Sequence, residues 1–413
     1  MSDNKNQSRK GTPDFQLLIL TLLLVGFGLV MVFSSSSSIS IVNSKFNNDA
    51  MYFTKKQLMF GGLGLISMFV TMNIPYARYK KLFVPVFIVT LIMLLLVPYI
   101  GTNVNGARSW FGVGSFGIQP SELAKITIVL YLAALISKKG ERFRDLRTGY
   151  IPVMMIVGFV AGLIMLQPDF GSCLILVATA GLVIFAGGAN LKHILGSIGL
   201  LILGASIVLG AQFLFEKLSG AEASHNYKAG RIQAYLDPLH DPQGVSYNLV
   251  QSLIAIGHGG AAGTGFGQSI QKLHYLPNPY NDFIFSVIGE EFGFIGTFLF
   301  LLFYIYFIWR GILVSVRCPD TFGTLVGVGI MGLIAIQAFI NIGGVTNTIP
   351  ITGVTLPFIS YGGSSLMVMM ASMGIVLSIS RQASVPVPQE RTKSVVVKQA
   401  TIPDRPRKRT YTR

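Results

Sequence analysis

The stretch LPNPYNDFIFSVIGEEFG, residues 276–293, is the most informative part of this chain. Pro277 and Pro279 interrupt any helix that enters the stretch from its N-terminal side. From Phe283 onward the residues are apolar and aromatic enough to cross a bilayer as a helix. We therefore expect Asp282 to open a membrane helix, with its carboxylate at the membrane surface.

The composition around this stretch is that of a membrane protein. The chain has 413 residues, of which 51% are hydrophobic and 12% are charged, and its mean hydropathy is +0.61. Soluble domains carry about a quarter charged residues. The composition therefore predicts an all-α polytopic membrane protein. The formal charge of +15 is explained by basic membrane loops and does not require a nucleic-acid partner.

Hydropathy predicts ten transmembrane helices. The expected spans are 15–35, 57–75, 82–100, 119–137, 151–167, 170–189, 192–215, 283–309, 323–345 and 364–380. The first span resembles a signal peptide but lacks a convincing cleavage site, so we interpret it as an uncleaved helix. An even number of spans places both termini on one side. Most of the 32 lysines and arginines fall on that side, so the positive-inside rule makes the termini cytoplasmic and Asp282 extracytoplasmic.

Three parts of the chain follow from this topology. They are a cytoplasmic N-terminal segment over 1–14, a ten-helix domain over 15–381 with a large extracytoplasmic loop over 216–282, and a basic tail over 382–413. The tail has too few apolar residues to fold, so we expect a disordered cytoplasmic tail close to anionic membrane lipids.

Two loops have features of their own. In the large loop, residues 247–256 have apolar side chains at helical spacing and predict an amphipathic or re-entrant helix. The glycine cluster at 257–267 is expected to be a flexible turn and lacks the flanking strand of a nucleotide-binding fingerprint. The loop at 346–363 has no charge and several prolines and glycines, which predicts a segment that folds back into the protein.

Polar residues mark the outer starts of four spans, where the positive ends of the helix dipoles point outward. These starts contain Ser121 and Glu122, Asp169, Asp282, and Gly362, Gly363, Ser364 and Ser365. Any single start has the ordinary explanation of helix capping. Four starts on one face favour a site that binds an anion such as phosphate through free N–H groups.

Basic residues on the same side could complete a cationic pocket. The candidates are Arg108, Lys125, Arg231 and Lys272. Lys125 lies about one turn inside a span, where a charge is costly and is a functional candidate by default. The alternative for Lys125 is a structural ion pair with Asp169 or Glu122.

The acids suggest two kinds of role. A helix dipole favours an ionised Asp282, which could act as a general base or as a ligand of Mg²⁺ or Mn²⁺. Glu290 and Glu291 lie about 12 Å deeper along the expected helix and are more consistent with structural pairing. The histidines and the two cysteines show no metal-binding spacing and no disulfide framework, and nothing indicates an organic cofactor. The residues alone thus predict a lipid-borne phosphate or pyrophosphate substrate, without saying whether it is moved or transformed.

The motifs resemble those of the SEDS family of bacterial cell-wall proteins, which includes FtsW, RodA and SpoVE. The shared segments are NGARSWF at 105–111, QPSELAK at 119–125, QPDFG at 167–171, YNLVQSLIAIGHGG at 247–260, YLPNPYNDFIFSVIGEEFG at 275–293 and LPFISYGGSS at 356–365. The forms at 271–277 and 356–365 are most like the division-type FtsW branch. One departure is Asn278, where the family more often has glutamate.

The resemblance implies a peptidoglycan glycosyltransferase of the bacterial cytoplasmic membrane. Such an enzyme polymerises lipid II, a disaccharide-pentapeptide on undecaprenyl pyrophosphate, and works with a class B penicillin-binding protein and other division proteins at the septum. The essential aspartate of the family falls on Asp282. The alternatives are a lipid II flippase, an elongation-type or sporulation-type polymerase of the same family, and a non-catalytic scaffold.

Overall fold

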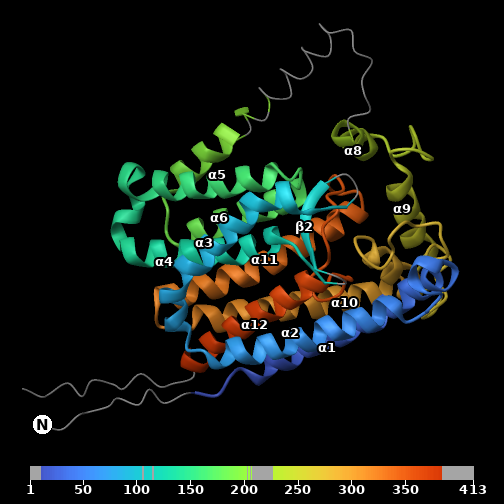
Figure 1. The fold of residues 1–413 in the computed structure, drawn as a ribbon, viewed down its shortest axis with the longest axis horizontal. Coiled ribbons are helices and arrows are strands. Elements are labelled where there is room, and N and C mark those ends of the chain that lie inside the picture. The colour runs from blue at the N-terminus through green and yellow to red at the C-terminus, as the bar shows by residue number, and fades with distance from the viewer. Residues whose placement is uncertain are drawn as a thin grey trace, which may run out of the picture.

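The computed structural model describes residues 11–104, 107–113, 116–201, 203–204, 206 and 227–383. Long helices lie side by side, and α1 begins at the end of the bundle where α12 finishes (Figure 1). There the backbone N–H of Asp14 donates to the hydroxyl of Ser380 over 3.0 Å. This contact agrees with the prediction that both termini lie on one side. The predicted basic tail from 384 onward and residues 1–10 lie outside the described residues.

Helices account for most of the described chain. The long ones are α1 Phe15–Val42, α2 Tyr52–Asn73, α3 Tyr76–Ile100, α4 Pro120–Lys139, α5 Ile151–Met165, α6 Phe170–Ala186, α10 Ile284–Val316, α11 Thr321–Val345 and α12 Gly363–Ala383. Shorter helical pieces are η1 Ser44–Phe46, η2 Gly140–Arg144, η3 Leu146–Tyr150, Leu191–Leu201, α8 Tyr227–Leu236 and α9 Tyr247–Gly259.

Nine of the ten predicted spans coincide with a helix, and the tenth, 192–215, does so over 192–201, while most of its remainder lies outside the described residues. Within the described residues, seven helices are long and apolar enough to cross a membrane: Phe15–Val42, Tyr76–Ile100, Pro120–Arg144, Leu146–Met165, Ile284–Val316, Thr321–Val345 and Gly363–Gln382. The all-α membrane class is therefore confirmed, and the count of ten crossings stays a prediction. Helices α4, α11 and α12 form the interior, because 78%, 72% and 83% of the residues in their most apolar windows are buried.

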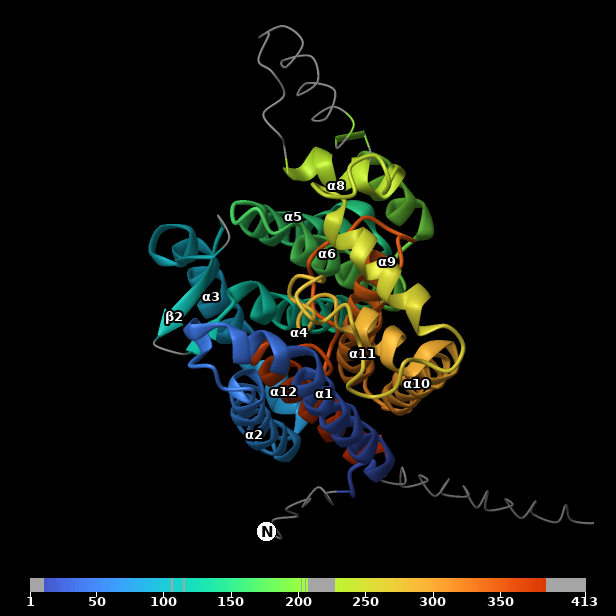
Figure 2. The same ribbon diagram turned by 90° about the vertical axis from the view of Figure 1, so that its right-hand side faces the viewer.

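A small sheet replaces an expected loop between α3 and α4. Its antiparallel strands are β1 Thr102–Val104, β2 Ala107–Val113 and β3 Phe116–Ile118, in the order β1-β2-β3. The sheet lies at the end of the bundle opposite the termini (Figure 1). Helices α8 and α9 lie at this same end, and Figure 2 looks onto it. We call it the outer end from here on.

Helix α10 is not the continuous helix that hydropathy predicts. Gly293 adopts φ 63° and ψ −168°, which breaks the helix into two parts. The segment 260–265 fills the break: the carbonyls of Glu290 and Glu291 accept from the N–H groups of Thr264 and Gly265 over 3.0 and 3.1 Å. On the other side, the N–H groups of residues 294 and 295 donate to the carbonyls of residues 260 and 261. The expectation of a flexible glycine turn is therefore wrong, because the glycines are held in this break.

Candidate functional site

Three of the four predicted helix starts contact one another at the outer end of the bundle. Asp169 caps α6 by accepting from the N–H of Ser172 over 3.0 Å, and its other carboxylate oxygen accepts from the hydroxyl of Ser121 at the start of α4. The next residue of α4, Glu122, accepts from the hydroxyl of Ser365 in the first turn of α12. Contacts between side chains thus link α6, α4 and α12, so the grouping predicted from helix directions is confirmed for these three starts.

Lys125 is fully buried among these starts. Its ammonium lies 2.9 Å from a carboxylate oxygen of Glu122 and 3.0 Å from the amide oxygen of Gln337 on α11. The amide nitrogen of Gln337 in turn donates to the carbonyl of Thr355 in the loop before α12. The sequence left open whether Lys125 binds substrate or forms an ion pair. In the structure it forms the ion pair, and the partner is Glu122 rather than Asp169.

Removing this ammonium should destabilise the protein strongly. We expect Lys125→Met to lower the free energy of unfolding by about 3–5 kcal/mol, because it leaves the buried carboxylate of Glu122 without its partner. The double variant Lys125→Met/Glu122→Gln should recover most of this loss. Thermal unfolding of the purified protein in detergent measures both effects. A double variant no more stable than the single one would contradict the importance of the pair.

Asp282 lies two residues before α10 begins at Ile284 and is half-buried. Its backbone carbonyl accepts from the side-chain amide of Asn341 on α11 over 2.8 Å. The same amide nitrogen donates to the carbonyl of Val354 over 2.7 Å. Asp282 and Asn341 also line one small pocket, together with Phe283, Ile340, Gly344, Val345, Ile351, Thr352, Gly353 and Val354. The predicted helix start is thus confirmed to within two residues, and Asp282 is one of the residues that line the pocket.

The second half of the loop 346–362, from Val354 to Ser360, packs inside the protein, as the lack of charge predicts for the loop. Leu356, Phe358 and Ile359 are buried. The side-chain amide of Gln57 on α2 clamps the end of this loop, since it donates to the carbonyl of Ser360 and accepts from the N–H of residue 362. The loop therefore forms a fixed wall beside Asp282.

An aromatic cluster joins this loop to the Asp282 segment. The N–H of Tyr361 donates to the carbonyl of Tyr280 over 2.9 Å, and Phe53 of α2 stacks on Tyr280 with ring centroids 4.2 Å apart. Burial, with a smaller contribution from the charge of Asp282, raises the pKa of Tyr280 to about 12. Tyr280 is therefore a neutral phenol near pH 7, and it holds the segment two residues ahead of Asp282.

The start of α12 contains several of the residues that were predicted to bind an anion. Gly363 packs against Phe60 of α2, so a Cβ there would lie 2.4 Å from the ring. The N–H of Gly362 already donates to Gln57. The hydroxyl of Ser364 is buried, and among the described residues it has no hydrogen-bond partner. Ser364, in the first turn of α12, is therefore the group here best suited to meet an added anion.

The predicted cationic pocket assembles only in part. Arg108 lies on β2 with an exposed side chain and donates to the carbonyl of Tyr99. The side chain of Arg231, in α8, lies outside the described residues. Lys272 is buried, and its ammonium lies 2.7 Å from a carboxylate oxygen of Glu291. The expectation that Lys272 faces an outward pocket is therefore wrong, because its charge is used inside the protein.

Glu290 and Glu291 have the structural partners that the sequence favours. Both side chains are buried. Glu290 accepts from the N–H groups of Ile270 and Gln271 and from the ring Nδ1 of His258 at 2.9 Å. The donor at His258 agrees with the prediction of a basic partner or a break in the backbone.

Two functional residues were missed by the sequence interpretation. Gln337 and Asn341 are four residues apart, so they lie on one face of α11. Gln337 fixes Lys125 and the 346–362 loop, and Asn341 fixes that loop to Asp282. The available signal was a pair of amides at helical spacing in an otherwise apolar span.

This fold and site define a class: a multi-pass helical membrane protein with a carboxylate and several helix starts gathered at its outer end. The chain belongs to the FtsW/RodA/SpoVE family, whose sequence model, described as "Cell cycle protein", matches residues 15–385. The resemblance to the SEDS family is thereby confirmed.

Individual relatives match along nearly the whole chain. Stage V sporulation protein E of Bacillus subtilis is 43% identical over 380 residues, covering 91% of this chain and 98% of the relative. A protein of Trichlorobacter lovleyi named probable peptidoglycan glycosyltransferase FtsW is 40% identical, covering 89% and 93%. A chain of a solved peptidoglycan synthase complex superposes with a TM-score of 0.73 at 27% identity, covering 90% and 98%.

Proposed function

We propose that this protein is a peptidoglycan glycosyltransferase that polymerises lipid II at the outer face of the bacterial cytoplasmic membrane. The observation that carries the proposal is the placement of Asp282 at a helix start beside an outer pocket, with the starts of α4, α6 and α12 gathered nearby. The glycosyltransferase named among the relatives and the peptidoglycan synthase complex among the structural neighbours support it. A substrate with a lipid tail can keep the tail in the bilayer while its sugars reach this end.

The chemistry is a transfer between two sugars. The 4-hydroxyl oxygen of the acceptor sugar forms a bond to the anomeric carbon of the growing chain. The bond from that carbon to undecaprenyl pyrophosphate breaks, and the pyrophosphate leaves with the electron pair. Asp282 takes the proton of the attacking hydroxyl. General-base assistance of this kind is worth about 10²–10⁴ in rate.

The leaving pyrophosphate needs positive charge or N–H donors. Lys125 and Lys272 form buried ion pairs, so they serve this purpose less well than the sequence suggests. Arg108 is exposed on β2 at the same end of the bundle, and the positive end of the α12 dipole carries the unpaired hydroxyl of Ser364. We assign the stabilisation of the leaving group to these two elements.

A divalent cation fits the same site only with the help of the substrate. Among the described residues, no group of three or more His, Cys, Asp or Glu side chains could hold a metal ion. Mg²⁺ is commonly held by one or two carboxylates together with substrate phosphates. Asp282 would be the protein ligand in that arrangement, and a bound Mg²⁺ or Mn²⁺ would neutralise charge on the pyrophosphate.

The alternative is a transporter that flips lipid II without forming a bond. A path for its head group would require polar or charged side chains along the bundle. In the described part of the chain, the buried charges of Lys125, Glu122, Lys272 and Glu291 are paired with one another. This pairing favours a polymerase. A non-catalytic scaffold would leave the pocket beside Asp282 without a purpose.

One assay separates these functions. The full chain, reconstituted in vesicles with its partner, is given fluorescently labelled lipid II, and glycan products and lipid movement are measured in parallel. We expect glycan strands to form. Movement of lipid II across the vesicle membrane without glycan would contradict the proposal in favour of a flippase, and the absence of both would favour a scaffold.

We further propose a class B penicillin-binding protein as the partner, cytoplasmic termini, and a role at the division septum. The synthase complex is described for coordinating polymerization and crosslinking, which supports a crosslinking partner. A sporulation-type role is the second candidate, because a stage V sporulation protein is 43% identical. A fluorescent fusion that labels the septum of vegetative cells would favour division. Labelling confined to sporulating cells would favour the second role.

A further inference from the structure

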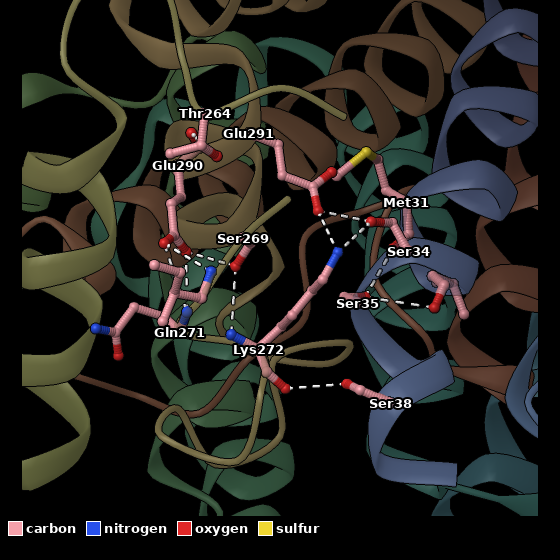
Figure 3. A network of polar contacts seen from close by, with 12 residues as sticks. Met31, Ser34, Ser35, Ser38, Thr264, Ser269, Gln271, Lys272, Glu290 and Glu291 are labelled. Atoms are coloured by element: carbon pink, nitrogen blue, oxygen red, sulfur yellow. Dashed lines mark hydrogen bonds and ion pairs between the residues drawn. The ribbon is translucent and has the colours of Figure 1, made fainter. Parts of the chain in front are cut away.

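A second polar site lies eight to nine residues after Asp282 along the chain, where the adjacent carboxylates of Glu290 and Glu291 hold the chain after α9 (Figure 3). Glu290 binds the backbone N–H groups of residues 270 and 271 and the hydroxyl of Ser269. Glu291 binds the ammonium of Lys272 over 2.7 Å. Four consecutive residues, 269–272, are therefore held by α10 through buried charged groups.

The first helix also takes part in this site. The hydroxyl of Ser34 donates to Glu291 over 2.6 Å and lies 3.0 Å from the ammonium of Lys272. One turn along α1, the hydroxyl of Ser38 donates to the backbone carbonyl of Lys272. Figure 3 shows the lysine side chain extending from its loop toward both α1 and α10. Ser34 and Ser38, the two ends of the serine run 34–38, thus bind the loop.

The ion pair closes a loop of chain that contains the proposed general base. Asp282 lies ten residues after Lys272 and nine residues before Glu291. One side of this loop is the first part of α10, and the other side is the irregular segment from 273 to 281. Because Lys272 and Glu291 are held together, the irregular segment 273–281 starts from a fixed position. It then has only a short distance to span between Lys272 and the start of α10. Its outer part is held by Tyr280 and Asn341.

We propose that Lys272 and Glu291 are positioning residues for the glycosyltransferase reaction: their buried ion pair, joined by Ser34, sets the place of Asp282 at the pocket. This inference rests on the proposed function. The pair does not touch the reacting atoms and acts through the backbone of residues 273–281. A displacement of about 1 Å at a reacting group can cost about 100-fold in rate, so a fixed base for this segment matters for catalysis.

The test uses the full chain with its partner and three variants, Lys272→Met, Glu291→Gln and the double variant. Each single variant leaves one buried charge unpaired, so we expect a lower Tm and a lower kcat. The double variant leaves no unpaired charge, so its Tm should return to within a few degrees of wild type. If the pair positions Asp282, its kcat should still be reduced about 10- to 100-fold, with the KM for lipid II within about threefold.

Hydrogen exchange gives a readout that does not depend on activity. The amides of residues 272–282 should exchange faster in all three variants than in wild type. The matched control is Lys55→Met, which removes the lysine of a solvent-exposed ion pair with Asp49 and should change neither kcat nor this exchange.

The outcomes are separable. A double variant with normal Tm and wild-type kcat, or with unchanged exchange over 272–282, overturns the positioning role while the glycosyltransferase stands. Wild-type polymerisation by Asp282→Asn overturns the catalytic role of Asp282, and the positioning role fails with it, although the chain would still be a polymerase. The proposed function itself is overturned if the wild-type chain with its partner forms no glycan from lipid II. A stable double variant with reduced kcat and faster exchange supports the inference.

Discussion

Asp282→Asn should reduce the rate of lipid II polymerisation at least about 100-fold, while the protein keeps its fold and its affinity for lipid II. The amide cannot take the proton of the attacking hydroxyl and is a poor ligand for a divalent cation. The contact with Asn341 survives the change, because Asn341 binds the backbone carbonyl of residue 282 and not its carboxylate. The loss should therefore appear in kcat, with a small effect on KM.

A matched control exists at the opposite end of the bundle. Asp320 precedes α11 as its N-cap residue and makes no capping hydrogen bond with its side chain. Asp320→Asn removes the same charge ahead of a membrane helix, so it should leave polymerisation unchanged. The measurement is glycan formation from labelled lipid II by each variant with its partner. Wild-type activity in Asp282→Asn would exclude this carboxylate as the catalytic group.

Sequence reasoning worked where a physical rule acts over a whole segment. Hydropathy located the helices because bilayer-spanning helices need long apolar runs. Helix direction then grouped the starts at Asp169, Ser121 and Ser365, and their contacts are present in the structure. The loop 346–362 was expected to fold back into the protein because it is uncharged. Irregular backbone that is buried needs hydrogen-bond partners, and the side chains of Gln57, Gln337 and Asn341 supply them.

Sequence reasoning failed where the outcome depends on one contact between distant residues. Apolar residues continue on both sides of Gly293, so hydropathy could not detect the break in α10. From the sequence, Lys272 was expected to face an outward pocket. Its buried partner is Glu291, nineteen residues further along the chain, and no residue near Lys272 in the sequence indicates this pairing. The sheet holding Arg108 consists of one strand of seven residues and two of three residues, which are too short to give a clear periodic signal.

The break in α10 and the buried carboxylates belong to one arrangement. A helix interrupted in the apolar interior exposes carbonyl and N–H groups that need partners. The segment 260–265 supplies them through backbone groups, and Thr264 adds a hydroxyl to the carbonyl of Glu290. The side chains of Glu290 and Glu291, directly before the break, then hold the residues that follow this segment. The large outer loop is thereby anchored within the helix that begins next to Asp282.

Gly293→Ala should destabilise the folded protein by about 2–4 kcal/mol, which is large for a single methyl group. The backbone at Gly293, φ 63° and ψ −168°, is almost restricted to glycine. A Cβ there would lie 2.2 Å from the backbone nitrogen of Gly263, which cannot move away without breaking the hydrogen bonds that fill the gap. Thermal unfolding in detergent measures the loss, and hydrogen exchange over residues 260–265 should rise with it.

The comparison that isolates the break is Gly158→Ala in α5. An added Cβ at Gly158 meets no atom within 4 Å, and its backbone is helical, so this change should be neutral or stabilise by about 0.5–1 kcal/mol. The two variants add the same methyl group to the same protein. They differ in the backbone conformation at the substituted residue and in the atoms around the added methyl group. Equal stabilities would mean that α10 can run straight through residue 293. The loop 260–265 would then have no gap to fill, and its hold on the Asp282 segment would have to come from Glu290 and Glu291 alone.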